Sequence, residues 1–157
     1  METDNSIIYQ ISHSTAETFQ IALEFAAGLS SGDIVALTGE LGAGKTEFAR
    51  GICQGLGYSG EVSSPSFVRV HYYNLQPAIQ NPKPKIQNVI HSDFYLAKSL
   101  EDALDYGLDE LYGGDNLILI EWAERFPAAL PKQYWHVIIE FSPDDENHRR
   151  ITINKRG

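Results

Sequence analysis

Residues 39–46 read Gly-Glu-Leu-Gly-Ala-Gly-Lys-Thr, which matches the pattern G-x-x-x-x-G-K-[ST]. In this pattern, backbone N–H groups surround the phosphates of a nucleotide, and glycines permit the positive φ angles that this requires. Lys45 can reach the β- and γ-phosphates, and the Thr46 hydroxyl can bind Mg²⁺. We predict that nucleotide phosphates are bound by Glu40, Leu41, Gly42, Ala43, Gly44, Lys45, Thr46 and Glu47. The alternative is a glycine-rich turn before an ordinary helix.

A magnesium-dependent site also needs carboxylates at the ends of strands beside the first one. Glu121 ends the apolar run 117–120, which is the arrangement of a Walker B acid. Asp93 follows a second apolar stretch by the same logic. We therefore take Lys45, Asp93 and Glu121 as candidate catalytic residues, and Thr46 and Glu121 as candidate metal ligands. An ordinary strand-end carboxylate facing solvent is the other interpretation of Glu121.

Three polar side chains alternate at His91, Asp93 and Tyr95, a spacing that can put all three on one face of a strand. This spacing does not distinguish a catalytic group from a structural hydrogen-bond network around a buried histidine. Trp122, beside the candidate acid, is predicted either to stack on a nucleotide ring or to fill the core.

The turn 63–67 is rich in hydroxyls and follows the helix after the glycine-rich segment. Loops that sense the state of a nucleotide often fall at this place. Ser64 and Ser66 are thus candidate switch-loop residues, and a plain connecting loop is the alternative. We expect ATP to close this loop onto the γ-phosphate.

The elements that position these groups follow from hydrophobic patterning. A strand at 33–38 and a helix at 45–56 flank the glycine-rich segment, and 117–121 is typical of a strand buried in a parallel sheet. Further strands are expected at 6–11, 67–73, 89–91, 135–141 and 149–154, with the last two forming a hairpin, and further helices are expected to begin at 14 and to cover 99–111. The pattern predicts an α/β fold with a small mixed sheet, a parallel core and antiparallel edge strands, flanked by helices.

Length and composition indicate one folded domain over residues 1–157, with 75–88 as an exposed loop insertion. The net charge of −9 disfavours direct binding to nucleic acid and suits a protein that docks on other proteins. The basic group near the C-terminus is read as a solvated strand, although a local basic surface is possible; it comprises Arg149, Arg150, Lys155 and Arg156. A single cysteine, Cys53, and the lack of a leader or a long apolar run predict a cytoplasmic protein without a membrane segment.

Four motifs together resemble the bacterial TsaE (YjeE) ATPases over nearly the entire chain. They are residues 39–46, Ser64-Pro-Ser-Phe67, His91-Ser-Asp-Phe-Tyr95 and Leu119-Ile-Glu-Trp122, in the family's order and at similar spacing. The last three make the resemblance specific. Two positions differ from the family pattern, because Ser66 stands where Thr is usual and Leu96 where Arg is common.

The resemblance implies a P-loop fold with ATP and Mg²⁺ as cofactors and an ATPase that is weak alone. It also implies docking onto two related proteins, TsaB and TsaD, which make threonylcarbamoyladenosine in tRNA, with tRNA met only through the complex. TsaD would carry out the transfer, while a protein like this one uses ATP to support repeated turnover. By motif, Lys45 would hold phosphates, Thr46 and Glu121 would serve Mg²⁺, Asp93 would act near the metal or attacking water, and Trp122 would line the nucleotide pocket.

Other classes share the glycine-rich segment. A small-molecule kinase would need an acceptor pocket and usually a lid bearing arginines, and the arginines here do not cluster in a loop between helices. A GTPase is disfavoured, because the only Asn-Lys pair, Asn154-Lys155, is followed by Arg156 and not by the guanine-reading tetrad. A non-hydrolysing nucleotide-binding subunit remains an alternative.

Overall fold

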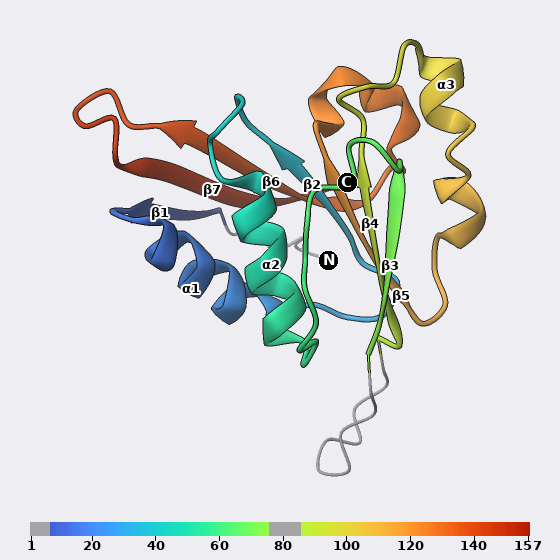
Figure 1. The fold of residues 1–157 in the computed structure, drawn as a ribbon, viewed down its shortest axis with the longest axis horizontal. Coiled ribbons are helices and arrows are strands. Elements are labelled where there is room, and N and C mark those ends of the chain that lie inside the picture. Colours follow the sequence, from blue (N-terminus) through green and yellow to red (C-terminus); the bar gives the residue numbers. More distant parts are fainter. Residues whose placement is uncertain (1–6, 76–85) are drawn as a thin grey trace.

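The apolar stretches of the chain form one seven-stranded sheet in a computed structural model that describes residues 7–75 and 86–157. The strands lie in the order β1-β7-β6-β2-β5-β4-β3 (Figure 1). Their bounds are β1 Ile8–Ser12, β2 Ile34–Thr38, β3 Val70–Asn74, β4 Asn88–Asp93, β5 Asn116–Glu121, β6 Tyr134–Phe141 and β7 Arg149–Arg156. The helices are α1 Thr15–Ala26, α2 Lys45–Gly55 and α3 Leu100–Leu104, and the 3-10 turns are η1 Leu108–Leu111, η2 Ala123–Arg125 and η3 Pro127–Ala129.

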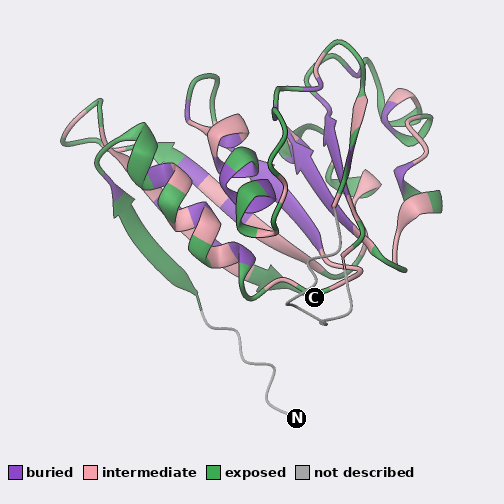
Figure 2. Cartoon of the chain, turned by 60° about the horizontal axis from the view of Figure 1, so that its bottom comes forward, coloured by how far each residue is buried: buried purple, intermediate pink, exposed green. Residues whose placement is uncertain are grey.

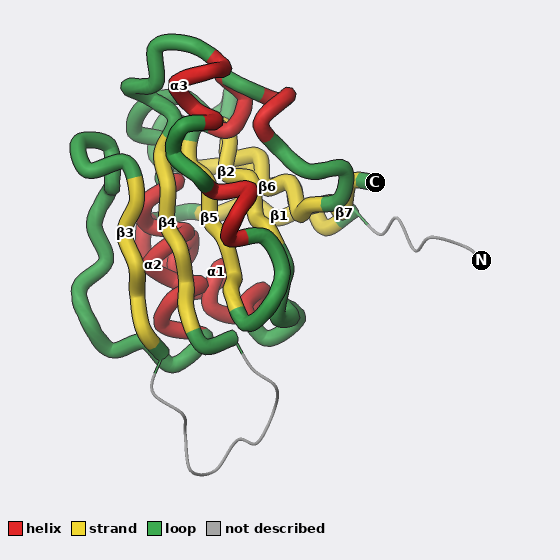
Figure 3. The backbone as a smooth tube through the Cα atoms, turned by 90° about the vertical axis from the view of Figure 1, so that its right-hand side faces the viewer, coloured by secondary structure: helices red, strands yellow, loops and turns green. Residues whose placement is uncertain are grey.

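The pairing of the strands confirms the predicted fold class. β2 runs parallel to β5 and β6, and β4 runs parallel to β5. The outer pairs are antiparallel, namely β1 with β7, β7 with β6, and β3 with β4. Figure 3 shows β3 at one edge of the sheet, beside β4 and β5. The predicted hairpin of the last two strands is confirmed, with Phe141 opposite Arg149.

Apolar side chains fill both faces of the central strands, because each strand alternates its side chains between the two faces. Val35 and Leu37 of β2 belong to the layer beneath α1 and α2. Ile34 and Ala36 belong to the layer beneath α3 and the 3-10 turns. Figure 2 shows the central strands buried and β1 exposed at its edge. The carboxyl ends of β2, β4 and β5 therefore sit on a rigid support.

Close packing of α1 on α2 fixes the helix that follows the glycine-rich segment. A Cβ at Gly51 of α2 would lie 2.4 Å from the carbonyl oxygen of Phe19 and 2.6 Å from the Cβ of Ala22. The Ser14 hydroxyl fixes the start of α1, because it accepts a hydrogen bond from the N–H of Glu17. The helix expected to begin at 14 therefore starts where the sequence predicts.

Most predicted boundaries lie within about two residues of the observed ones, but two predicted elements differ by more. The single helix expected at 99–111 is α3 followed by η1, because Gly107 adopts φ 74° and interrupts the helical backbone. The strand expected from 67 starts at Val70, because the N–H groups of Val68 and Arg69 both turn back to the carbonyl of Pro65. Arg69 also has a positive φ of 70°. This turn shapes the end of the loop 63–67.

The proposed insertion 75–88 lies mostly outside the described residues. At its base, the N–H of Leu75 donates to the carbonyl of Gln87 at 2.8 Å, and Asn88 already belongs to β4. In the part of the chain that the structure describes, no helix is long and apolar enough to cross a membrane.

Candidate active site

The segment from residue 39 to residue 44, here called the Walker A loop, connects the end of β2 to the start of α2. Gly44 precedes the helix at φ 115°, a conformation that strains any residue with a side chain. Gly39 is also required, because a Cβ there would lie 2.4 Å from the carbonyl oxygen of Ile139. The strand, loop and helix thus follow in the predicted order.

Lys45 is buried at the first turn of α2, with 5% of its surface exposed. Its Nζ donates to the carbonyl of Glu40 at 3.0 Å and to the carbonyl of Gly39, and it lies 3.8 Å from the centre of the Trp122 ring. Burial lowers the pKa of the Lys45 ammonium, an effect opposed by nearby carboxylates, of which Glu124 is the strongest. The cation is therefore held at the loop, and no carboxylate of residues 7–75 or 86–157 forms an ion pair with it.

Trp122 contacts the Lys45 cation and lies 4.9 Å, ring centre to ring centre, from Tyr95. Its backbone takes a positive φ of 57°, directly after the end of β5. The ring is half-buried, so it both packs against the core layer below and borders the site.

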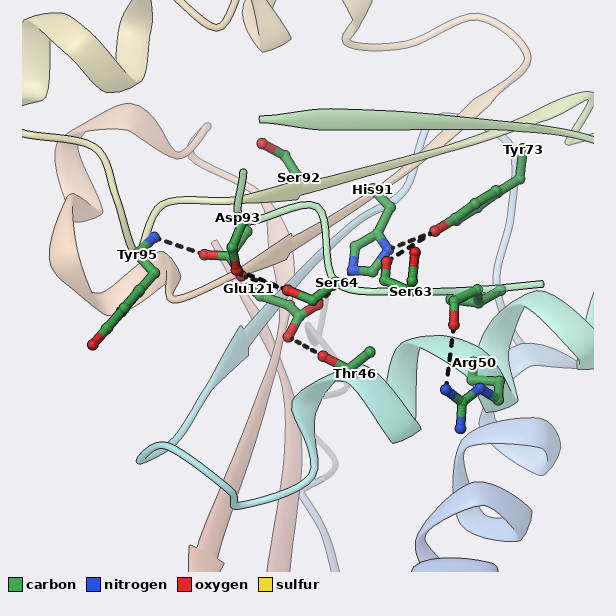
Figure 4. Close-up of polar contacts among 12 residues, drawn as sticks. Thr46, Arg50, Ser63, Ser64, Tyr73, His91, Ser92, Asp93, Tyr95 and Glu121 are labelled. Atoms are coloured by element: carbon green, nitrogen blue, oxygen red, sulfur yellow. Dashed lines mark hydrogen bonds and ion pairs between the residues drawn. The ribbon is translucent and has the colours of Figure 1, made fainter. Parts of the chain in front are cut away.

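Glu121, at the end of β5, makes hydrogen bonds to side chains of α2 and β4 (Figure 4). Its Oε1 accepts a hydrogen bond from the Thr46 hydroxyl at 2.8 Å, and its Oε2 lies 2.6 Å from Nε2 of His91. The other ring nitrogen of His91 lies 3.1 Å from the Tyr73 hydroxyl. Residue Glu121 is 2% exposed, so its side chain does not face solvent. The interpretation of Glu121 as an ordinary strand-end carboxylate facing solvent is thus wrong.

Asp93 ends β4 beside Glu121, with which its backbone is in register. Its Oδ2 accepts hydrogen bonds from the hydroxyls of Ser66 at 2.9 Å and Ser64 at 3.3 Å, and its Oδ1 accepts from the N–H of Tyr95 at 2.7 Å (Figure 4). Burial raises the pKa of the Asp93 carboxyl, while these hydrogen bonds oppose the rise. The loop 63–67 is thereby attached to the candidate site.

The remaining predicted residues of the Walker A segment occupy different surroundings. Glu40 and Leu41 are exposed at the tip of the loop, whereas Ala43 is buried. Glu47 pairs with Arg50 one turn along α2. The carbonyl of Gly42 accepts a hydrogen bond from the side chain of Arg149 in β7.

Sequence reasoning missed three contributors to this region. The Tyr73 hydroxyl supports His91, the Glu124 carboxylate accepts from the N–H of Gly39 at 3.3 Å, and Arg149 donates to the carbonyl of Ala43. The strand pattern places Tyr73 in β3, but it does not say that β3 lies beside β4. Glu124 lies within the 3-10 turn η2, which the hydrophobic pattern does not predict.

The arrangement offers three chemical features within one edge of the sheet. Backbone N–H groups and a lysine are suited to an anion such as a phosphate. The Thr46 hydroxyl and the Glu121 carboxylate converge at 2.8 Å, and oxygen ligands of this kind fit Mg²⁺. Asp93 adds a second carboxylate from the neighbouring parallel strand. These groups could therefore hold a phosphate and a divalent cation side by side.

A Walker A loop between a strand and a helix, with an acid at the end of the adjacent parallel strand, defines the P-loop class of α/β folds. The family model described as "Threonylcarbamoyl adenosine biosynthesis protein TsaE" matches residues 12–151, and the chain belongs to the TsaE family.

Curated relatives and a solved structure agree with this assignment. The chain is 36% identical to the Bacillus subtilis tRNA threonylcarbamoyladenosine biosynthesis protein TsaE, over 90% of this chain and 81% of that protein. It is 32% identical to the Treponema pallidum protein of the same name, over 91% and 97%. The crystal structure of Bacillus subtilis YdiB superposes with a TM-score of 0.76 at 29% identity, covering 99% of this chain and 90% of that one.

Proposed function

We propose that this protein binds and hydrolyses ATP as a component of the machinery that makes threonylcarbamoyladenosine in tRNA. It would act with TsaB-like and TsaD-like partners and support repeated turnover of the transfer. The observation that carries the proposal is the hydrogen bond between Thr46 and Glu121, because it joins the Walker A helix to the acid of the adjacent strand. The names of the family and of the relatives supply the pathway.

Each residue of the site has a proposed part in binding. The N–H groups of the Walker A loop and the Lys45 ammonium neutralise the phosphates. Among the described residues, Nζ of Lys45 contacts two carbonyl oxygens and an aromatic ring, and it can exchange those contacts for phosphate oxygens. Mg²⁺, held by Thr46 and Glu121, would supply charge neutralisation of the phosphate oxygens.

Asp93 has a proposed part in hydrolysis, in which a water oxygen bonds to the γ-phosphorus as the bond to the bridging oxygen breaks. A carboxylate beside Glu121 can orient that water and accept its proton, and burial favours the protonated form of Asp93. The Ser64 and Ser66 hydroxyls now donate to this same carboxylate. If these two hydrogen bonds break or form with the state of the nucleotide, the loop 63–67 would change its conformation, and a partner protein could recognise that change. The single buried cysteine suits the reducing cytoplasm where we place this activity.

Calorimetry with ATP and Mg²⁺ tests the binding part of the proposal. Lys45→Ala should weaken ATP binding by about a hundredfold, since it removes a charge-assisted contact to two phosphates. Lys98→Ala, at an exposed position outside the site, is the matched control and should bind as the parent does. Glu121→Gln should still bind ATP but lose magnesium-dependent hydrolysis. Normal ATP affinity in Lys45→Ala would contradict the assignment of the loop.

A further inference from the structure

Arg149, the first residue of β7, directs its side chain at the Walker A loop. Its Nε donates to the carbonyl of Ala43 at 3.1 Å, and its Nη2 donates to the carbonyl of Gly42 at 3.4 Å. The residues joined are more than a hundred positions apart in the chain. Arg149 is thus not part of a solvated basic strand, which the sequence pattern had suggested.

The guanidinium is itself held in place from the hairpin side. Its Nη1 donates to the carbonyl of Glu146 at 2.7 Å and to that of His148 at 3.0 Å. Its carbon lies 4.1 Å from the ring centre of Phe141, which is the direct partner of Arg149 in the antiparallel register. Since these contacts fix the planar guanidinium, its two other nitrogens, Nε and Nη2, meet the loop in one orientation.

This orientation matters for the direction of the loop N–H groups. In a trans peptide, the carbonyl and the N–H of the next residue point in opposite directions, and no cis peptide occurs among the described residues. When the carbonyl of Ala43 is held by Arg149, the N–H of Gly44 must point to the opposite side of the loop. A loop whose N–H groups already face the anion binds it without a reorganisation cost.

We propose that Arg149 is a positioning residue for the nucleotide, acting through the carbonyls of Gly42 and Ala43 to hold the Walker A loop in its phosphate-binding form. This inference rests on the proposed function, because it assigns the loop a nucleotide. It also makes the β6–β7 hairpin a part of the site, although that hairpin carries none of the predicted site residues.

The next residue provides a matched control. Arg150 is also an arginine and also lies in β7, but its side chain points to the other face of the sheet. There it approaches Glu140 at 3.7 Å, and no contact with the Walker A loop is found among the described residues. A change at Arg150 therefore removes a charge of the same sign from the same strand without touching the loop.

The test compares Arg149→Gln, Arg149→Lys and Arg150→Gln with the parent, in ATP calorimetry and in steady-state hydrolysis. For Arg149→Gln we expect the Kd and the KM for ATP to rise by about tenfold, with kcat within about twofold of the parent, since two charge-assisted hydrogen bonds to the loop are lost. The Kd and KM of Arg149→Lys should lie between those of the parent and those of Arg149→Gln, because an ammonium keeps the charge but lacks the planar guanidinium geometry. Arg150→Gln should leave both constants unchanged.

Thermal unfolding of each variant accompanies these measurements. If Arg149→Gln does not fold, Arg149→Lys carries the test with the same expected direction. Parent-like Kd and KM in a folded Arg149 variant, or an equal loss in Arg150→Gln, would overturn the inference while leaving the proposed function intact. Failure of the parent chain to bind ATP at all would overturn the proposed function and the inference together.

Discussion

Asp93 is a residue at which stability and chemistry oppose each other. The residue is 1% exposed, and burial raises the pKa of its carboxyl above the ordinary value. The folded chain then binds this proton more tightly than the unfolded chain does, so the group lowers the free energy of unfolding as pH rises above the unfolded pKa. Burial of the Asp93 carboxyl therefore makes the fold less stable at neutral pH than at acid pH.

We expect Asp93→Asn to raise the melting temperature at neutral pH by a few degrees, because the amide keeps an acceptor for Tyr95 and carries no charge. The gain should shrink near about pH 3, where the carboxyl is protonated in both states. Asp109→Asn, at an exposed position, should show no such gain. Melting curves of metal-free protein measure this, and a lower melting temperature at neutral pH would show that the hydrogen bonds outweigh burial.

The residues of the site were predictable in type more readily than in geometry. Thr46 and Glu121 could be paired from the sequence because the Walker A motif and the apolar run before an acid each imply a place at the same sheet edge. His91 could not, because its role depends on which strand lies beside β4 and on the Tyr73 hydroxyl that reaches it. Arg149 could not either, since its contacts cross more than a hundred residues of chain.

Among the elements, helix α2 packs closely against α1 because Gly51 has no side chain at the contact. We expect Gly51→Ala to lower the free energy of unfolding by about 2 kcal/mol, because the added Cβ would lie 2.4 Å from a backbone oxygen that cannot move alone. Gly28→Ala is the control, since its Cβ would lie 3.7 Å from the carbonyl oxygen of Phe25 and no positive φ is required. Chemical denaturation compares the two. Equal stability of both variants would show that α1 shifts to accept the methyl group.

The loop 63–67 is the element that we expect to move with the nucleotide. Phe67 is 92% exposed, so chymotrypsin can reach it, while Ser64 and Ser66 attach the loop to Asp93. A non-hydrolysable ATP analogue with Mg²⁺ should slow cleavage after Phe67 relative to ADP, because the loop would close on the γ-phosphate. Phe67→Ala identifies the fragment that arises from this cut. The same cleavage rate with analogue, ADP and no nucleotide would contradict a switch role.

The hydrophobic pattern predicts which elements exist better than it predicts where they begin and end. The parallel core was predictable, because continuous apolar runs such as 117–120 are buried on both faces. The division of 99–111 into α3 and η1 was not predictable, because a glycine in the sequence does not reveal whether it adopts a positive φ, as Gly107 does. The start of β3 was obscured in the same way, because the alternation of residues 67–70 continues through a turn closed on the carbonyl of Pro65.

The whole molecule carries a net charge of −9, which repels a phosphate backbone. We therefore expect the purified chain alone to bind tRNA with a Kd weaker than about 100 μM at physiological salt. Filter binding with a salt series measures this, and the partner complex serves as the positive control. Micromolar binding that weakens steeply with salt would instead indicate a direct basic contact surface.

We propose that this molecule is an ATPase whose activity depends on partner proteins. The decisive measurement is phosphate release from ATP by the purified chain alone and with the TsaB-like and TsaD-like partners, with Lys45→Ala as the control for contaminating activity. We predict slow release by the chain alone and a clear rise with the partners, both absent in Lys45→Ala. An unchanged rate in the presence of both partners would contradict the proposed role.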